Sequence, residues 1–210
     1  VACQGVGRGE HLASGIAGAT SGRIAPVWIV RIGLLAEIVG VAGVGFAIGP
    51  DASWVPLIPL LFVYGVGVGL ATAQLTGVVL ADVPVADSGA ASGTQSTSRQ
   101  LGAALGVAIL GTVLFTSTAG ILAASLDDQG VPAAQRDQVV SSVVDSAGAA
   151  ISGLAANPET ADAADAAREA FSDGTRYAAW TAAGFLALGL LATVSLGGAA
   201  AQSSRRDGES

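Results

Sequence analysis

Four long stretches of apolar residues, separated by short polar segments, dominate the chain. Charged residues are absent from residues 52–81, 100–126 and 177–204, and the stretch 32–50 contains a single one, Glu37. A bilayer hydrocarbon core about 30 Å thick requires roughly 20 mostly apolar helical residues, and a helix satisfies its own backbone hydrogen bonds where water is excluded. The pattern therefore predicts an all-α integral membrane fold with four transmembrane helices. Their expected spans are residues 27–49, 56–81, 95–119 and 177–197.

The arginines set the expected orientation, because basic residues near the ends of spans favour the cytoplasmic side. Five of them fall on one side of the four spans: Arg23, Arg31, Arg99, Arg205 and Arg206. The other side receives the turn 49–53, which has no basic residue, and the long connection 120–176. We therefore expect a multi-pass protein of the cytoplasmic membrane with both termini in the cytoplasm.

This orientation divides the chain into five segments. In chain order they are a cytoplasmic N-terminal remnant (1–26), three transmembrane helices (27–119), an acidic helical extracytoplasmic loop (120–176), the last transmembrane helix (177–197) and a cytoplasmic tail (198–210). The loop carries nine acidic and three basic residues, but long loops cross the membrane largely regardless of such charges.

Within the loop, the spacing of apolar residues favours two helices. Pro132 suits a first helical turn. One apolar stripe follows it at helical spacing: Val140, Val143, Val144, Ala147, Ile151 and Leu154. Asn157 and Pro158 are typical of the start of a second helix, and Gly174 is its expected end. The pattern fits an amphipathic hairpin that rests on the outer membrane surface or on neighbouring loops, and a ligand-binding role for its carboxylates is the alternative.

Composition agrees with a membrane protein and removes most other classes. Apolar residues make up 51% of the chain and charged residues 12%, compared with about 25% charged residues in soluble domains. One cysteine (Cys3), one histidine (His11) and no lysine exclude a disulfide framework, a metal cluster and a lysine-dependent phosphate loop. A net charge of −7 leaves no basic face for nucleic acid. We expect no enzymatic activity, no cofactor and no metal.

Glycines spaced one helical turn apart mark the second and third spans. Such spacing lets helix backbones approach closely. Close approach matters in a membrane, because lipid is as apolar as the side chains and the hydrophobic effect does not drive helices together. The residues expected to pack in this way are Gly65, Gly69, Gly89, Gly93, Gly102 and Gly106.

Polar residues in the spans are candidates for a substrate or proton pathway, because polar groups in lipid tend to face a partner or a cavity. The candidates are Glu37, Tyr64, Gln74, Arg99 and Gln100. Tyr64 and Gln74 suit either an interhelical hydrogen bond or a cavity wall. The long side chain of Arg99 can reach the interface or a phosphate, or it can pair with a carboxylate.

Glu37 is the one acid within an expected span. If a Glu carboxylate is assigned the same cost as Asp, placing it at the centre of a transmembrane helix costs about 3 kcal/mol of insertion free energy. The presence of Glu37 therefore requires a reason. Three interpretations are open. Glu37 lines the path of a substrate or proton, or it pairs with Arg31 or Arg99, or the span starts later and leaves Glu37 near the cytoplasmic interface.

Several motifs resemble a known family. Around the third span they are Asp82-Val83-Pro84, Ser88-Gly89-Ala90-Ala91-Ser92-Gly93 and Ser98-Arg99-Gln100-Leu101-Gly102-Ala103-Ala104-Leu105-Gly106-Val107-Ala108. These residues resemble the penultimate-helix region of the major facilitator superfamily and are most similar to its fourteen-helix drug:proton antiporters of actinobacteria. Ser21-Gly22-Arg23-Ile24-Ala25 and Arg31-Ile32-Gly33-Leu34 resemble the cytoplasmic loop that opens the eleventh helix of that family.

The resemblance implies that the four spans are helices eleven to fourteen, and that ten earlier helices are missing from a chain that starts at Val1 without Met. The chain would then be a carboxy-terminal fragment of a proton-coupled multidrug or small-molecule efflux transporter. Its implied partners are the lipid bilayer, the missing amino-terminal helices, a small amphipathic substrate and the proton. The family's proton-coupling motifs belong to the absent half, so no coupling residue carries over.

Two other functional classes remain as alternatives. The first is a stand-alone four-helix membrane protein that acts as an assembly or sensor subunit through its outer loop. The second is an alanine-rich soluble helical protein, which the long charge-free stretches disfavour.

Overall fold

The computed structural model describes residues 26–50, 52–80 and 83–207, and over these residues the chain consists of helices joined by short connections, without a strand. The four long helices are α2 (Pro26–Ala47), α3 (Leu57–Leu80), α4 (Ser88–Asp128) and α7 (Ala161–Asp207). The short ones are η1 (Val85–Asp87), α5 (Ala133–Asp145), α6 (Ala150–Ala155) and η2 (Pro158–Thr160). Each long helix contains a stretch apolar and long enough to cross a membrane, which confirms the all-α membrane fold. The expectations for residues 1–25 lie outside the described residues.

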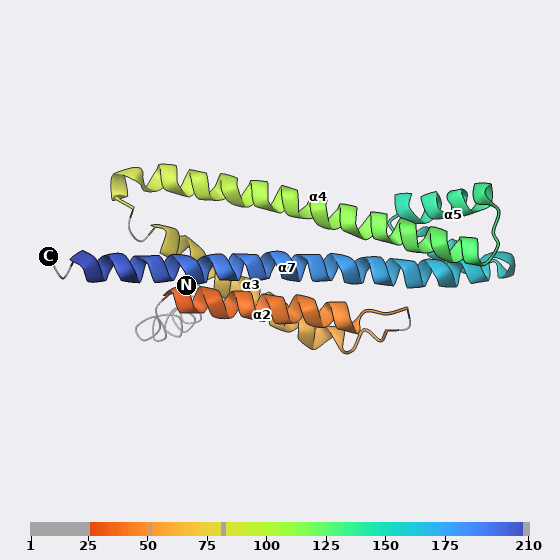
Figure 1. Cartoon of the computed structure of the whole chain (residues 1–210), viewed down its shortest axis with the longest axis horizontal. Helices are drawn as coiled ribbons and strands as arrows, with labels where there is room; N and C mark the ends of the chain where they lie inside the picture. Colours follow the sequence, from red (N-terminus) through yellow and green to blue (C-terminus); the bar gives the residue numbers. More distant parts are fainter. Residues whose placement is uncertain (1–25, 51, 81–82, 208–210) are drawn as a thin grey trace, which may run out of the picture.

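Two of the long helices exceed what a bilayer requires. α2 and α3 have 22 and 24 residues, or roughly 33 and 36 Å at 1.5 Å per residue, close to the hydrocarbon thickness of about 30 Å. α4 and α7 have 41 and 47 residues, or roughly 61 and 70 Å. Both extend past α2 at the end where α5 lies (Figure 1). They therefore carry a helical extension beyond the membrane-length bundle.

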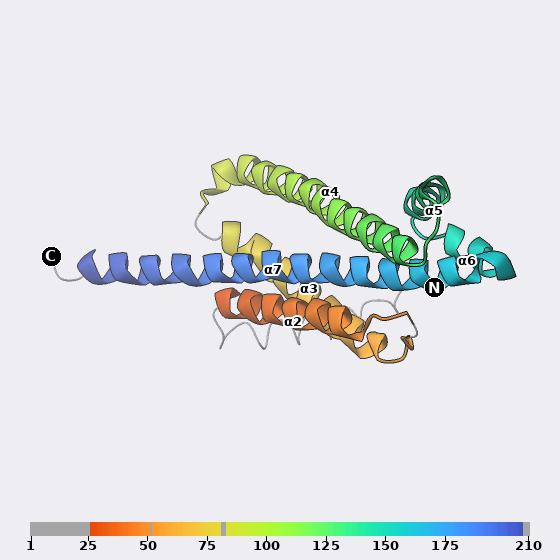
Figure 2. The same ribbon diagram turned by 45° about the vertical axis from the view of Figure 1, so that its right-hand side comes forward.

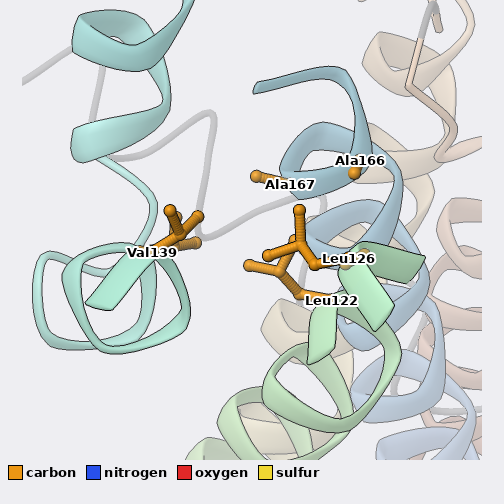
Figure 3. Packing of buried hydrophobic residues seen from close by; sticks show 7 residues of the cluster. Leu122, Leu126, Val139, Ala166 and Ala167 are labelled. Carbon is orange, nitrogen blue, oxygen red and sulfur yellow. The ribbon is translucent and has the colours of Figure 1, made fainter. Parts of the chain in front are cut away.

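Most of the completely buried side chains of the described chain gather in this extension, residues 122–170, which we call the cap. Leu122 and Leu126 of α4 and Val143 of α5 are completely buried. Figure 3 shows Leu122 and Leu126 facing Val139 of α5 on one side and the alanines at the start of α7 on the other. Burial of large apolar side chains against small ones stabilises the cap as a packed unit. The long connection is thus a folded helical structure with its own core.

The apolar stripe expected along a single helix from Val140 to Leu154 is interrupted, so that expectation is wrong. α5 ends at Asp145, where the amide of Gly148 donates to the carbonyl of Val143 at 2.8 Å and the amide of Ala147 donates to Val144 at 3.0 Å. This pair of bonds is a Schellman ending. It places Ala147 at φ 50°, in the left-handed region.

The expected start of the second loop helix is confirmed. The side chain of Asn157 accepts a hydrogen bond from the amide of Glu159 at 3.0 Å, and Pro158 occupies the first turn. Pro132 lies immediately before α5, at its N-cap position. These local signals were readable because each depends on a few neighbouring residues.

The expected helix end at Gly174 is wrong, because α7 continues without a break from Ala161 to Asp207. Gly174 instead lies against α4. A Cβ added there would collide with Oγ1 of Thr118 and would stand 2.9 Å from the carbonyl oxygen of Leu114. The glycine is therefore required for the close approach of two helices rather than for a turn.

α2 and α3 also approach backbone to backbone. A Cβ added to Gly67 would stand 2.6 Å from the carbonyl oxygen of Gly33 and 2.7 Å from the amide nitrogen of Glu37. One added to Gly40 would stand 2.7 Å from Cβ of Tyr64. Close glycine contacts of this kind are typical of membrane helix pairs. α2 and α3 therefore form a tightly packed antiparallel pair.

α4 is set apart from this pair. It lies beside α7 at the cap and separates from it toward Ser88, as the two views of Figure 1 and Figure 2 agree. Residues 96–105 of α4 are all exposed, whereas Thr118, Leu122 and Leu126 are buried. The divergence of α4 from the other long helices leaves space between them in the middle of the bundle.

Candidate functional site

A cavity of about 460 Å³ occupies this space, with all four long helices contributing to its wall. It is lined by Glu37 and Val41 of α2, Tyr64 of α3, Gly102, Leu105, Gly106, Ile109 and Leu110 of α4, and Ala182, Phe185 and Leu186 of α7. Glu37 is the single charged residue in this lining. The cavity is therefore apolar apart from one carboxyl group, and it is open, since the Leu105 and Phe185 side chains in its wall are more than half exposed.

Glu37 lies in the middle of α2, eleven residues after Pro26 and ten before Ala47. Its side chain is 9% exposed, and its backbone is pressed against Gly67 of α3. Because α2 begins at Pro26, the helix bounds do not favour the interpretation in which the span starts later. Glu37 is placed at mid-membrane depth if α2 crosses the bilayer along its length.

The ion pair considered for Glu37 does not form within the described part of the chain. Arg31 donates from Nη2 to the carbonyl of Thr193 at 2.9 Å, and its guanidinium lies 5.2 Å from the ring centre of Trp28. Arg99 is exposed on α4. The ion pairs of the described residues are all formed by other groups. Glu37 therefore faces the cavity without a cationic partner.

The remaining candidates divide between the cavity and the helix surfaces. Tyr64 lines the cavity, which is one of the two positions considered for it from the sequence. Gln74, Arg99 and Gln100 are not part of the cavity wall. Gly102 and Gly106 line the cavity. At all six of the predicted packing glycines, an added Cβ would meet nothing within 4 Å. Their packing against other helices stays a prediction, since inside the described chain the close contacts belong to other glycines, among them Gly33, Gly40, Gly67 and Gly174.

The apolar part of the wall was not identified from the sequence. Leu105, Ile109 and Phe185 are ordinary side chains for a membrane helix, and nothing in their spacing separates a cavity face from a lipid face. Their role depends on the angle between α4 and α7, which is a tertiary property. The sequence signal that did point here was the isolated acid Glu37.

A second, polar cavity of about 870 Å³ lies in the cap. Its wall includes the carboxylates of Glu159, Asp162, Asp165 and Glu169, together with Arg168, which pairs with Asp165. Within the described residues no group of three or more potential ligands is arranged to hold a metal ion. These carboxylates are spread along exposed helix surface, as expected for a solvated face.

The cap is also held by an ion-pair network at its outer end. Arg136 of α5 donates from Nη1 to Asp127 at 2.5 Å and from Nε to Asp137 at 3.0 Å. Both hydrogen bonds raise the pKa of the Arg136 guanidinium, and the bond to the Asp127 carboxylate has the larger effect. The bond to Asp127 joins the end of α4 to the start of α5.

Comparison with known proteins gives several curated relatives. The chain is 36% identical over 124 residues to a probable actinorhodin transporter of Streptomyces coelicolor, a match covering 57% of this chain and 21% of that protein. It is 33% identical over 132 residues to the multidrug resistance protein Stp of Mycobacterium tuberculosis, covering 61% of this chain and 25% of the relative. A multidrug resistance protein B homolog of Mycobacterium tuberculosis is 28% identical over 109 residues, covering 51% and 20%.

The matched part of each relative is thus about a fifth to a quarter of its length. No protein-family model matches the chain, and no solved structure gives a significant match.

Proposed function

We propose that the chain forms part of one helical bundle of a membrane exporter for small amphipathic molecules, driven by exchange with protons. The observation that carries the proposal is the cavity at the centre of four membrane-length helices, with the unpaired carboxyl group of Glu37 in its wall. The names of the relatives, an antibiotic transporter and multidrug resistance proteins, support it. The resemblance of the motifs around α4 to the major facilitator superfamily supports a position of this chain in the carboxy-terminal part of such a transporter.

The geometry suits such a role because transporters bind their cargo near the bilayer midplane, between helices that move relative to one another. α2 is joined to α3 by close backbone contacts and to α7 by hydrogen bonds from the side chains of Arg31 and Arg176. α4 closes the cavity from the other side. It packs extensively on α7 and touches α3 at only a few residues. Movement of α4 relative to the other three helices would open and close the chamber around a bound molecule.

In this proposal Glu37 carries the exchangeable proton or contacts the cargo. An ionised carboxylate in an apolar chamber is costly unless it is paired, so it favours either a proton or a cationic group of the cargo. The two occupants would compete for one group, which is the basis of an exchange. The remaining helices of the transporter would complete the bundle and its partner.

The test is export by the complete transporter that contains this chain. Glu37→Gln should reduce the export of an amphipathic fluorescent dye from intact cells at least tenfold across an external pH range of about 6 to 8, with unchanged amounts of protein in the membrane. Asp162→Asn, in the wall of the polar cavity of the cap, is the matched acid-to-amide control and should export normally. Normal export by Glu37→Gln over the whole range would contradict the proposal.

A further inference from the structure

We propose that Arg31 and Trp28, near the start of α2, form a binding site for the headgroup of an anionic phospholipid, whose acyl chain lies along the exposed apolar face of α2. Arg31 joins this end of α2 to α7, and the two helices lie side by side in both views (Figure 1 and Figure 2). The inference concerns the membrane around the chain and goes beyond export, so the site and the proposed function can fail separately.

Arg31 is a cation without a counterion among the described residues. Its Nη2 donates to the carbonyl oxygen of Thr193 at 2.9 Å, whereas the ion pairs in the described part of the chain belong to Arg136, Arg168 and Arg176. Its Nε is buried and has no hydrogen-bond partner there. A buried donor without an acceptor costs free energy. The guanidinium therefore still requires an acceptor, preferably one that carries negative charge.

Arg176, at the other end of the same two helices, shows how the chain satisfies such a group by itself. Both arginines donate from Nη2 to a carbonyl oxygen of the facing segment at 2.9 Å, Arg31 to Thr193 and Arg176 to Ile48. Arg176 also donates from Nη1 to Asp173, one turn away on α7, at 2.7 Å. The residues three and four positions from Arg31 on α2 are all apolar. α2 therefore cannot neutralise Arg31 as α7 neutralises Arg176.

The position of the Arg31 guanidinium suits a headgroup phosphate. Arg31 lies five residues after Pro26, where α2 begins, and its guanidinium lies 5.2 Å from the ring centre of Trp28, one turn nearer the helix start. The 22 residues of α2 roughly match the hydrocarbon thickness, so a spanning α2 places this turn at the boundary with the headgroups. Trp28 is 57% exposed, and exposed tryptophan is typical of that boundary.

An exposed apolar stripe continues from Trp28 toward the middle of α2. It consists of Trp28, Ile32, Leu35 and Val39, which are each about half exposed and follow one another at the spacing of a single helix face. From Trp28 to Val39 the stripe is roughly 16 Å long, close to half of the 30 Å hydrocarbon core. A lipid with its phosphate at Arg31 can therefore lay one acyl chain along this stripe.

An anionic headgroup is favoured over a zwitterionic one. A guanidinium binds phosphate oxygens through charge-assisted hydrogen bonds, and its planar fork suits two oxygens at once. A choline headgroup brings a cation of its own that competes with Arg31, whereas a glycerol headgroup does not. The net charge of −7 repels anionic lipids from the chain in general. A local preference for them at α2 therefore has to come from the local cation.

The experiment measures lipid selectivity at Trp28. The chain contains three tryptophans, so the Trp54→Phe/Trp180→Phe variant of the 210-residue chain retains Trp28 alone. It is reconstituted into vesicles of phosphatidylcholine with increasing fractions of phosphatidylglycerol that carries bromine on its acyl chains, which quenches tryptophan fluorescence on contact. The quenching gives the binding constant of phosphatidylglycerol relative to phosphatidylcholine. Both leaflets have the same composition, so the result does not depend on orientation.

The matched control is the Trp28→Phe/Trp54→Phe variant, which retains Trp180 alone. Trp180 lies one turn from Arg176, whose charge is neutralised by Asp173. Trp180 should therefore show a binding ratio near one. Circular dichroism and gel filtration in detergent confirm that each variant is folded before reconstitution.

With Arg31 intact, Trp28 should favour phosphatidylglycerol about fivefold, which corresponds to the roughly 1 kcal/mol of one arginine near an anionic surface. Arg31→Gln should reduce this ratio to near one, and Arg31→Lys should keep it within about twofold of the parent. The inference is overturned by an absent preference at Trp28 with Arg31 intact, by an equal preference at Trp180, or by a preference that survives Arg31→Gln.

Free phosphate is the other source of the same chemistry. An excess of inorganic phosphate on both sides of the vesicles should leave the ratio at Trp28 as it is in sodium chloride of equal ionic strength. Loss of the preference in phosphate alone would assign the site to a soluble anion and overturn the lipid site. A lipid preference in a transporter that exports nothing would reject the exporter and keep the site, and export without the preference would do the reverse.

Discussion

Arg176 of α7 donates a hydrogen bond from Nη2 to the carbonyl of Ile48, just past the end of α2, at 2.9 Å. The bond from Arg31 of α2 to Thr193 of α7 is its counterpart at the other end of the pair. The two contacts are seventeen residues apart on both helices, or roughly 25 Å along each axis. Equal spacing on two antiparallel helices fixes their register at both ends.

Removing the Arg176 contact should destabilise the chain. The guanidinium satisfies a terminal carbonyl and places a positive charge at the C-terminal end of α2, where the helix dipole favours it. Arg176→Ala should lower the free energy of unfolding by about 1 to 2 kcal/mol, measured as a lower thermal midpoint in detergent.

Arg168→Ala is the matched control on the same helix. Arg168 pairs with Asp165 on an exposed surface, and such pairs contribute about 0 to 1 kcal/mol. Equal loss of stability in Arg168→Ala and Arg176→Ala would show that the hydrogen bond between Arg176 and Ile48 does not contribute to the free energy of unfolding.

A methyl group at Gly174 should separate α4 from α7. It would collide with Thr118 and with the carbonyl of Leu114, and overpacking of this kind costs about 1 to 3 kcal/mol. Gly174→Ala should therefore lower the thermal midpoint of the chain and increase proteolysis of the cap. Gly189→Ala, on the same helix, meets no atom within 4 Å, so it should be neutral or stabilising by about 0.5 to 1 kcal/mol. The packing argument fails if the two variants unfold alike.

The α2–α3 contact predicts a contrast between two glycines of one helix. Gly67→Ala should push α3 away from Gly33 and destabilise the 210-residue chain, because both colliding atoms belong to a backbone. Gly65→Ala meets open space and should be neutral or stabilising in the same chain. In the complete transporter of the proposed function, Gly65→Ala should become destabilising if that face packs on another helix, as its spacing predicts. Thermal unfolding of both variants in both proteins makes the comparison.

The orientation derived from the arginines can be tested by thiol labelling. In a variant without Cys3, a cysteine at Ser53 or Ser141 should react with an impermeant thiol reagent applied to intact cells. A cysteine at Ser88 or Ser203 should react only after the cells are opened. The reverse pattern would invert the topology.

The features that could be predicted from the sequence are those that depend on neighbours along the chain. The four helices long enough to cross a membrane follow from long apolar stretches. The Asn157 cap follows from the adjacent proline and from a side chain that accepts a hydrogen bond from the amide of Glu159. Glu37 was identified because an acid within a hydrophobic stretch is costly. Each of these signals is contained within about one helix or one turn.

The features that were missed are contacts between distant segments. Gly174 resembles a helix end in the sequence, but its partner Thr118 lies on a different helix. Gly65 and Gly67 belong to the same glycine-rich run, and only the rotation of α3 against α2 decides which of them packs. The left-handed backbone of Ala147 was missed because alanine rarely adopts it.

The close contact between α4 and α7 lies far from the start of α4. Thr118 and Gly174 meet at the edge of the cap, and the arm of α4 from there to Ser88 is thirty residues long, or roughly 45 Å. A rotation of about 10° at this contact displaces the far end of such an arm by about 8 Å. A small change in the angle between the two helices at Gly174 would therefore move the far end of α4 by several ångströms, and the wall of the cavity lies between the two.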